Sequence, residues 1–181
     1  NLVLNGRWLQ KFCVGAAQLD RYGNANNSVI GDDYDRPRVR LPGTAGLADM
    51  GSIGKQLYFW HPNHSPRSLV KKVDFISAAG YLDGGDARER LGLKGGPQVV
   101  ITNLAVMDFH PVSKRMRLQS VHPGVTVAAV QKATGFELLL PEGSVPETAP
   151  PTKAQVKLIR EVIDPDNMRK RGFRGGRSER N

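Results

Sequence analysis

One stretch, residues 12–49, constrains the fold of this chain more than any other. It opens with the apolar run at residues 12–17, whose length is typical of a strand buried on both faces in a parallel sheet. A loop of small residues at 43–46 then leads into a segment with apolar residues at helical spacing. A strand, a glycine-containing loop and a helix start are the parts from which α/β proteins build anion sites, because helix N-termini carry free N–H groups and a partial positive charge.

The rest of the sequence predicts an α/β fold: an open, mostly parallel sheet flanked by helices, with an antiparallel hairpin. The expected strands are residues 12–17, 57–60, 72–76, 99–102, 104–109, 115–121 and 136–140, and the expected helices are residues 46–56, 127–134 and 152–163. The hairpin is expected from strands 104–109 and 115–121, because the second alternates polar and apolar side chains. Thr126 and Gly135 are the expected caps of the middle helix. The glycine-rich segment 79–98 predicts a long irregular surface segment with one helical turn at 86–91.

The chain is expected to divide into a domain and a C-terminal part. Residues 1–140 form the α/β domain, and residues 141–151 form a proline-rich linker. Residues 152–155 have capping-box spacing, so a helix is expected within 152–168, packed on the domain. Residues 169–181 hold six Arg or Lys and one Glu, and therefore carry +5 of the net charge of +9. They contain too few apolar residues to fold, which predicts a disordered basic tail.

Composition argues against membrane and disulfide-rich classes. No apolar run approaches the roughly 20 residues that a membrane-spanning helix needs. The single Cys13 cannot form an internal disulfide, and we interpret it as a buried small hydrophobe. A chain without disulfides fits the reducing cytoplasm. The chain opens at Asn1 rather than Met, so we expect that an N-terminal portion is missing.

Several short motifs resemble those of class I CoA-transferase β subunits. The run GAAQLD at residues 15–20, followed by YGN at 22–24, is similar to the GGAQID-x-YGN element of that family. The resemblance returns in the same order at residues 29–32, 40–46, 70–75, 82–85, 88–93, 96–102, 114–116 and 158–165. Because the ordered set covers nearly the whole chain, the sequence is identified as a member of this family, nearest to its glutaconate type.

The resemblance implies an enzyme that moves coenzyme A between two carboxylic acids. Its substrates would be an acyl-CoA and a carboxylic acid, its partner an α subunit, and no cofactor beyond the substrate CoA is expected. In the family a glutamate attacks the thioester, and a glutamyl-CoA thioester follows. That glutamate belongs to a Glu-Ser-Gly or Glu-Asn-Gly element upstream of the GAAQLD-like run. This chain has no such tripeptide, so no catalytic residue is assigned to it.

The same resemblance points to binding residues. Gly43, Thr44, Ala45 and Gly46 would offer backbone N–H groups to the oxygen of the thioester, although Ala45 stands where the family commonly has glycine. Gln18 and Asn24 would face the acyl group from the end of a strand. From the residues alone two alternatives stay open. The loop could be an ordinary turn before a helix, and the two amides could brace the neighbouring turn.

Other functions have less support in the sequence. His61 and His64 are three residues apart, but Pro62 interrupts a helix and no ligand partner is close in sequence, so no metal site is predicted. The acidic and basic residues at 32–40 favour a solvated loop or an interface with self-paired charges. The first alternative function is a CoA-thioester hydrolase of the same superfamily, acting on ring-derived acyl-CoA. The second is a nucleic-acid-binding module that uses the RGG-like basic tail, for which a merely solvated tail is the favoured interpretation.

Overall fold

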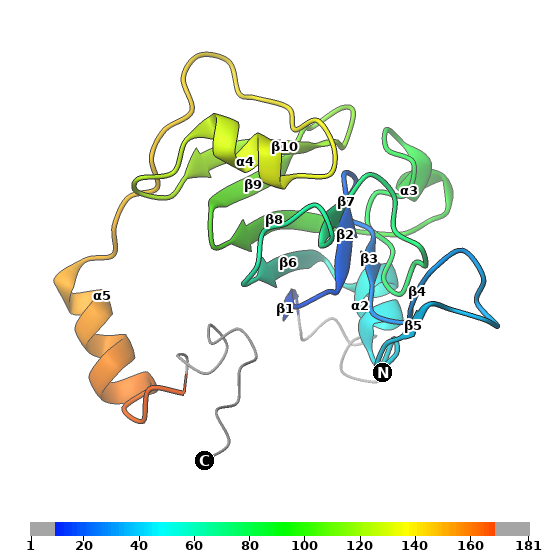
Figure 1. Ribbon diagram of the computed structural model, residues 1–181, viewed down its shortest axis with the longest axis horizontal. Helices are drawn as coiled ribbons and strands as arrows, with labels where there is room; N and C mark the ends of the chain where they lie inside the picture. The colour runs from blue at the N-terminus through cyan, green and yellow to red at the C-terminus, as the bar shows by residue number, and fades with distance from the viewer. Residues whose placement is uncertain (1–9, 169–181) are drawn as a thin grey trace. The chain divides into compact units, whose positions relative to one another are not determined.

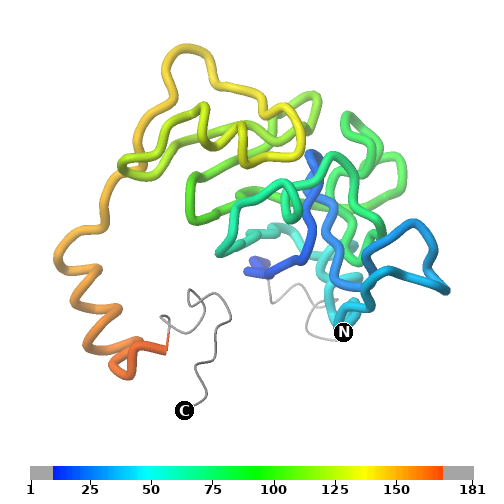
Figure 2. The backbone as a smooth tube through the Cα atoms, viewed as in Figure 1, coloured from blue at the N-terminus to red at the C-terminus, as the bar shows by residue number. Residues whose placement is uncertain are grey.

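The computed structural model describes residues 10–168 (Figures 1 and 2). These residues divide into two compact units at the boundary between Thr148 and Ala149. The predicted basic tail, residues 169–181, lies outside the described residues. Within residues 10–168, no helix has both the length and the apolar character that crossing a membrane requires.

A five-stranded mixed sheet is the centre of the first unit (Figure 1). Its strand order is β1-β6-β8-β9-β10, where β1 is Lys11–Val14, β6 is Gln56–His61, β8 is Pro97–Thr102, β9 is Ala105–Phe109 and β10 is Met116–Val121. The β1·β6 and β6·β8 pairs are parallel, whereas the β8·β9 and β9·β10 pairs are antiparallel. This sheet confirms the predicted α/β fold and the hairpin.

The core lies on one face of this sheet because side chains alternate along each strand. Phe12 stands beside Leu57 across the β1·β6 pair, and Val100 stands beside Met107 across the β8·β9 pair, and all four are buried. Two helices contribute to the same core, α2 (Leu47–Ile53) through Leu47 and α4 (Val127–Ala133) through its fully buried Val130. Cys13 follows Phe12 and is exposed, so the prediction of a buried thiol is wrong.

Two smaller sheets carry the segment before α2. Strands β2 (Gln18–Asp20), β3 (Ala25–Asn26) and β7 (Leu69–Val70) form a three-stranded sheet in the order β3-β2-β7. Strands β4 (Val29–Ile30) and β5 (Val39–Arg40) form an antiparallel pair. Most of these strands have two residues, too few to show an alternating pattern in the sequence.

Two predicted strands and one cap are wrong. Residues 72–76 form no strand, because the backbone N–H of Asp74 donates to the Oε1 atom of Gln18 rather than to a neighbouring strand. Residues 136–140 form only one isolated bridge, between Arg117 and Leu139. The helix α4 begins at its predicted cap Thr126 but ends at Thr134. Gly135 is instead needed for close packing, since a Cβ atom there would lie 2.5 Å from the carbonyl oxygen of Leu69.

The second unit contains one helix. It begins as α5 (Lys153–Lys157) and continues as the π-helix η1 (Leu158–Ile163). The predicted capping box is confirmed, because the Thr152 hydroxyl accepts from the Gln155 N–H at 3.2 Å and the Gln155 side chain accepts from the Thr152 N–H at 2.8 Å. No residue of this helix is buried, and its packing on the domain stays a prediction. Of the predicted linker, Thr148 is tied to the first unit by a backbone hydrogen bond to Val121.

Candidate functional site

The small-residue loop lies beside the carboxyl end of β1. Asn27 makes the connection: its side-chain amide donates to the carbonyl of Gly15 at 3.1 Å and accepts from the N–H of Ala17 at 2.7 Å. The main-chain carbonyl of the same Asn27 accepts from the N–H of Gly43 at 2.8 Å. In open α/β sheets, ligands bind outside the carboxyl ends of the strands. The structure therefore places Gly43–Gly46 where this architecture usually holds a ligand.

The backbone of this loop is unusual at Ala45. Its φ angle is +47°, in the left-handed region that costs a non-glycine residue about 1–2 kcal/mol. This angle explains why the related family places glycine at that position. A chain of hydroxyl groups holds the loop in place, since the Thr44 Oγ1 atom lies 2.9 Å from the Ser28 Oγ atom, which lies 2.7 Å from the Ser77 Oγ atom.

Three consecutive N–H groups of this loop are free. The backbone N–H groups of Thr44, Ala45 and Gly46 make no hydrogen bond to any described residue, and Ala45 and Gly46 are exposed. Ala45 and Gly46 have φ angles of opposite sign, +47° and −82°. Opposite backbone conformations in sequence turn neighbouring N–H groups toward one side and create anion-binding concavities. The helix α2 that follows is only seven residues long, so the loop itself carries this feature.

Gln18 is a buried amide with one donor to spare. Its side chain is 6% exposed, and its Nε2 atom donates to the Oδ2 atom of Asp74 at 3.2 Å. Its Oε1 atom accepts from the Asn26 side chain at 2.7 Å and from the Asp74 backbone at 3.1 Å. An amide nitrogen has two N–H donors, and the described residues use one of them. Gln18 also lines a cleft of about 630 Å³, so the second donor is available to a ligand.

Asn24, by contrast, has no free hydrogen-bonding group. Its amide nitrogen donates to Asp20 at 2.8 Å and to the carbonyl of Leu82 at 2.9 Å, and its oxygen accepts from the N–H groups of Gly80 and Leu82. Burial raises the pKa of Asp20, while its hydrogen bonds from Asn24 and Tyr22 act in the opposite direction. These contacts match the alternative in which Asn24 braces the turn, and no hydrogen bond joins it to the loop.

The charged residues at 32–40 form no ion pair with one another in the described structure. The guanidinium of Arg40 instead lies 5.0 Å from the ring centre of Tyr34 and donates to its carbonyl at 3.0 Å. Asp33 accepts backbone hydrogen bonds from residues 35 and 36 and so closes its own turn. Among residues 10–168, no group of three or more His, Cys, Asp or Glu side chains could hold a metal ion.

His64 is a buried structural residue. Its Nδ1 atom lies 2.9 Å from the Thr102 hydroxyl and its Nε2 atom 2.8 Å from the Thr134 hydroxyl. The Thr134 hydroxyl donates to the carbonyl of Val130, so it accepts from His64, and we assign the proton of the neutral ring to Nε2. Burial, followed by the charge of His61, lowers the pKa of His64 to about 4.

The low pKa of His64 predicts acid sensitivity of the fold. Unfolding exposes an imidazole of pKa about 6.5, which binds a proton that the folded state refuses until about pH 4. The stability contributed by neutral His64 is therefore complete above pH 6.5 and is lost as the pH falls toward 4. Urea titrations from pH 7 to pH 4 should show a steeper loss of unfolding free energy in the wild type than in His64→Gln. Parallel pH curves for the two proteins would contradict this assignment.

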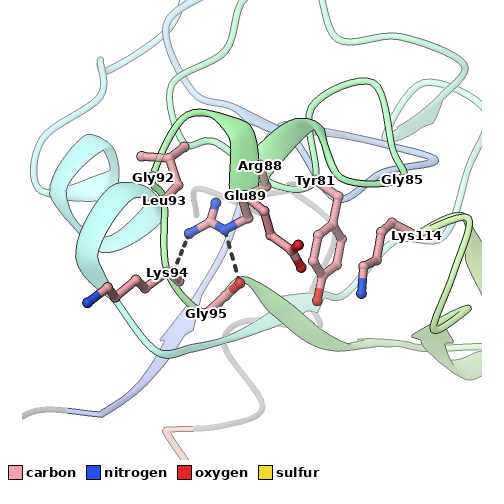
Figure 3. A pocket seen from close by; sticks show the side chains of 9 residues that line it. All are labelled: Tyr81, Gly85, Arg88, Glu89, Gly92, Leu93, Lys94, Gly95 and Lys114. Carbon is pink, nitrogen blue, oxygen red and sulfur yellow. Dashed lines mark hydrogen bonds between the residues drawn. The ribbon is translucent and has the colours of Figure 1, made fainter.

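A third feature, beside the helix α3 (Ala87–Arg90), is structural (Figure 3). Arg88 is 2% exposed, and its guanidinium faces the carbonyls of Lys94 and Gly95 at 2.7 and 3.0 Å. It also donates to the carbonyls of Gly51, Ala79 and Gly80, at 2.6, 2.9 and 2.9 Å. All five donors are thus used within the chain. The cleft of about 410 Å³ that Arg88 lines with Tyr81 and Lys114 has no free guanidinium group from it.

Comparison with known proteins identifies the family of this chain. The model of the family described as "Coenzyme A transferase" matches residues 1–133. The chain belongs to the coenzyme A transferase family. It is 40% identical over 165 residues to the β subunit of 3-oxoadipate CoA-transferase of Pseudomonas knackmussii, an alignment that covers 90% of this chain and 62% of the relative.

Two further relatives agree with this family assignment. The crystal structure of glutaconate CoA-transferase of Acidaminococcus fermentans matches with a TM-score of 0.79 and 33% identity, covering 92% of this chain and 62% of that chain. The subunit of a cholesterol ring-cleaving hydrolase of Rhodococcus jostii is 34% identical over 172 residues, which is 94% of this chain and 65% of the relative. The chain therefore spans about six tenths of the length of the relatives that it matches.

Proposed function

We propose that this chain is part of the β subunit of a CoA-transferase that moves coenzyme A between an acyl-CoA and a carboxylic acid. The observation that carries the proposal is the row of three free N–H groups at Thr44, Ala45 and Gly46, beside the carboxyl end of β1. Attack on a thioester places negative charge on its carbonyl oxygen, and one fixed N–H donor toward such an oxygen is worth about 2.7–4 kcal/mol.

Within this proposal the candidate residues have different roles. The loop holds the thioester oxygen, and Gln18 offers its spare N–H to the acyl group or to the acid. Asn24 acts indirectly, because all its donors and acceptors fix the turn after β2. The attacking glutamate and the glutamyl-CoA thioester belong to a segment upstream of the GAAQLD run, supplied by the rest of the same polypeptide. An α subunit completes the enzyme in the cytoplasm, and no metal or cofactor other than the substrate CoA is invoked.

A second candidate function is hydrolysis of a CoA-linked ring-derived compound. The supporting observation is the relative from Rhodococcus jostii, whose name is that of a ring-cleaving hydrolase. Its identity to this chain is lower than that of the Pseudomonas transferase, 34% against 40%. Transfer is therefore the preferred function. Nucleic-acid binding rests on the tail at 169–181, outside the described residues, and no observation favours it.

The two functions differ in one product. The full-length β chain and its α subunit should be incubated with an acyl-CoA and a second carboxylic acid, and both the new acyl-CoA and free CoA should be measured. We expect new acyl-CoA in proportion to the second acid and little free CoA. Free CoA that forms equally well without the second acid would support the hydrolase and contradict the transferase. The 181-residue chain alone is expected to be inactive in this assay.

A further inference from the structure

The cleft beside Gln18 has an unusual combination of side chains. We call it the arginine cleft. It measures about 630 Å³, a size that suits part of a small ligand. Apolar side chains from β4, β5 and β7 line it together with two arginines, one amide and one carboxylate: Ile30, Val70, Arg38, Arg67, Gln18 and Asp74.

The two arginines of this cleft are unpaired. Arg38 comes from the turn between β4 and β5 and Arg67 from the segment before β7, and neither makes an ion pair or side-chain hydrogen bond with a described residue. The one carboxylate of the cleft, Asp74, is already occupied: its Oδ2 atom accepts from Gln18 at 3.2 Å and from the N–H of Gly31 at 2.9 Å. Two free guanidinium groups beside one occupied carboxylate leave the cleft with a net positive charge.

The remaining wall fits an elongated acyl group. Ile30 and Val70 offer apolar surface, and the spare N–H of Gln18 offers one donor at a 6% exposed position. Guanidinium groups bind carboxylates and phosphates through paired, charge-assisted hydrogen bonds. The chemistry of the cleft is therefore that of an apolar channel with an oxyanion-binding end.

The arginine cleft is connected to the proposed thioester site by short segments. The strand β5 lines the cleft and ends at Arg40, three residues before Gly43. On the opposite strand, Ser28 directly precedes β4 and bonds to the Thr44 hydroxyl at 2.9 Å. One β-hairpin thus contributes to the cleft and anchors the loop.

We propose that the arginine cleft is an oxyanion-binding subsite, in which Arg38 and Arg67 hold a charged end of the substrate. The oxyanion has two chemical sources: a carboxylate at the far end of the acyl chain, or a phosphate of coenzyme A. The thioester itself would lie at Thr44–Gly46, so this subsite rests on the proposed function. It assigns to the two arginines the choice between charged and uncharged substrates.

The test compares three thioesters in the full-length β chain paired with its α subunit. These are glutaryl-CoA, pentanoyl-CoA and glutaryl-pantetheine, each measured by kcat/KM or, where turnover is absent, as a competitive inhibitor. If the oxyanion is the distal carboxylate, Arg67→Leu and Arg38→Leu should each weaken both glutaryl compounds roughly 10- to 100-fold and spare pentanoyl-CoA. If it is a phosphate, both CoA compounds should weaken and glutaryl-pantetheine should not. Arg67→Lys should recover part of the loss.

Arg36→Leu is the matched control, because Arg36 belongs to the same hairpin and does not line the cleft. It should leave all three thioesters unchanged. Arginine variants that match the wild type with every thioester, or that weaken all three equally, would overturn the subsite. A wild-type enzyme that shows no CoA transfer with any acid would instead refute the proposed function, so the two failures are distinct.

Discussion

Replacement of Arg88 by methionine is expected to lower the free energy of unfolding by about 3 kcal/mol or more. Methionine can fill the space of the side-chain stem, but it has no donor for the five carbonyl oxygens that Arg88 binds. Hydrogen bonds to a charged group contribute roughly 1.5–3 kcal/mol each, and a buried acceptor left without a partner adds a further cost. The loss should therefore be among the largest that a single substitution can cause in this chain.

The effect should extend beyond the helix α3. The carbonyls that Arg88 binds belong to three segments, one at Gly51 in α2, one at residues 79–80 and one at residues 94–95. Without the guanidinium, the irregular segment 79–98 loses its common anchor. Hydrogen exchange should accelerate in all three segments. Arg88→Lys should fall between the wild type and Arg88→Met, since an ammonium has three donors in place of five.

Arg90→Met is the matched control for stability. Arg90 lies two residues away, and its ion pair with Asp86 is exposed on both sides. Exposed pairs of this kind contribute little, so the variant should stay within about 0.5 kcal/mol of the wild type. Urea denaturation measures all three variants. If Arg88→Met proved as stable as Arg90→Met, the role of Arg88 as the anchor of this segment would be wrong.

Gly46→Val is expected to lower kcat of the paired, full-length enzyme roughly 100-fold or more, the scale of losing one oxyanion donor. The branched side chain would stand beside the N–H groups of Ala45 and Gly46 and block the approach of the thioester. The fold should tolerate valine there. The φ angle of Gly46 is −82°, and an added Cβ atom would meet only the flexible end of Met50, at 3.4 Å.

Ala48→Val makes the same kind of change two residues further along the exposed side of α2, and it is the control for Gly46→Val. It should change neither kcat nor the melting temperature appreciably. The measurements are turnover with the cognate acyl-CoA and thermal melts of both variants. Wild-type turnover in Gly46→Val would mean that the loop is an ordinary turn, an alternative that the residues alone left open.

The sequence was sufficient to predict elements with a clear period. The strand β6, the strand β8, the β9–β10 hairpin and the capped helix α4 were all expected from apolar runs, alternation or capping residues. Sequence failed where a side chain replaced a backbone partner. Residues 72–76 have the composition of a strand, but Gln18 binds the backbone of Asp74 from 56 positions away in the sequence. Periodicity cannot reveal such a contact.

The candidate site was predicted only in part. The small residues at 43–46 marked the loop, but the left-handed backbone of Ala45 and the free N–H groups required coordinates. Arg88 had no distinguishing signal, because an arginine in a glycine-rich charged segment is typical of a solvated surface. The unpaired state of Arg38 was equally hidden, since its neighbours in sequence include the carboxylates with which it was expected to pair.

Nuclear magnetic resonance of the backbone amides tests the central claim most directly, because it observes the three N–H groups themselves. The full-length β chain, labelled with ¹⁵N and paired with its α subunit, should be titrated with a non-hydrolysable thioether analogue of an acyl-CoA. The expected result is that the signals of Thr44, Ala45 and Gly46 shift together with saturating ligand, while that of Ala48 stays near its original position. Saturable binding that moves other signals and leaves those three unchanged would contradict the account.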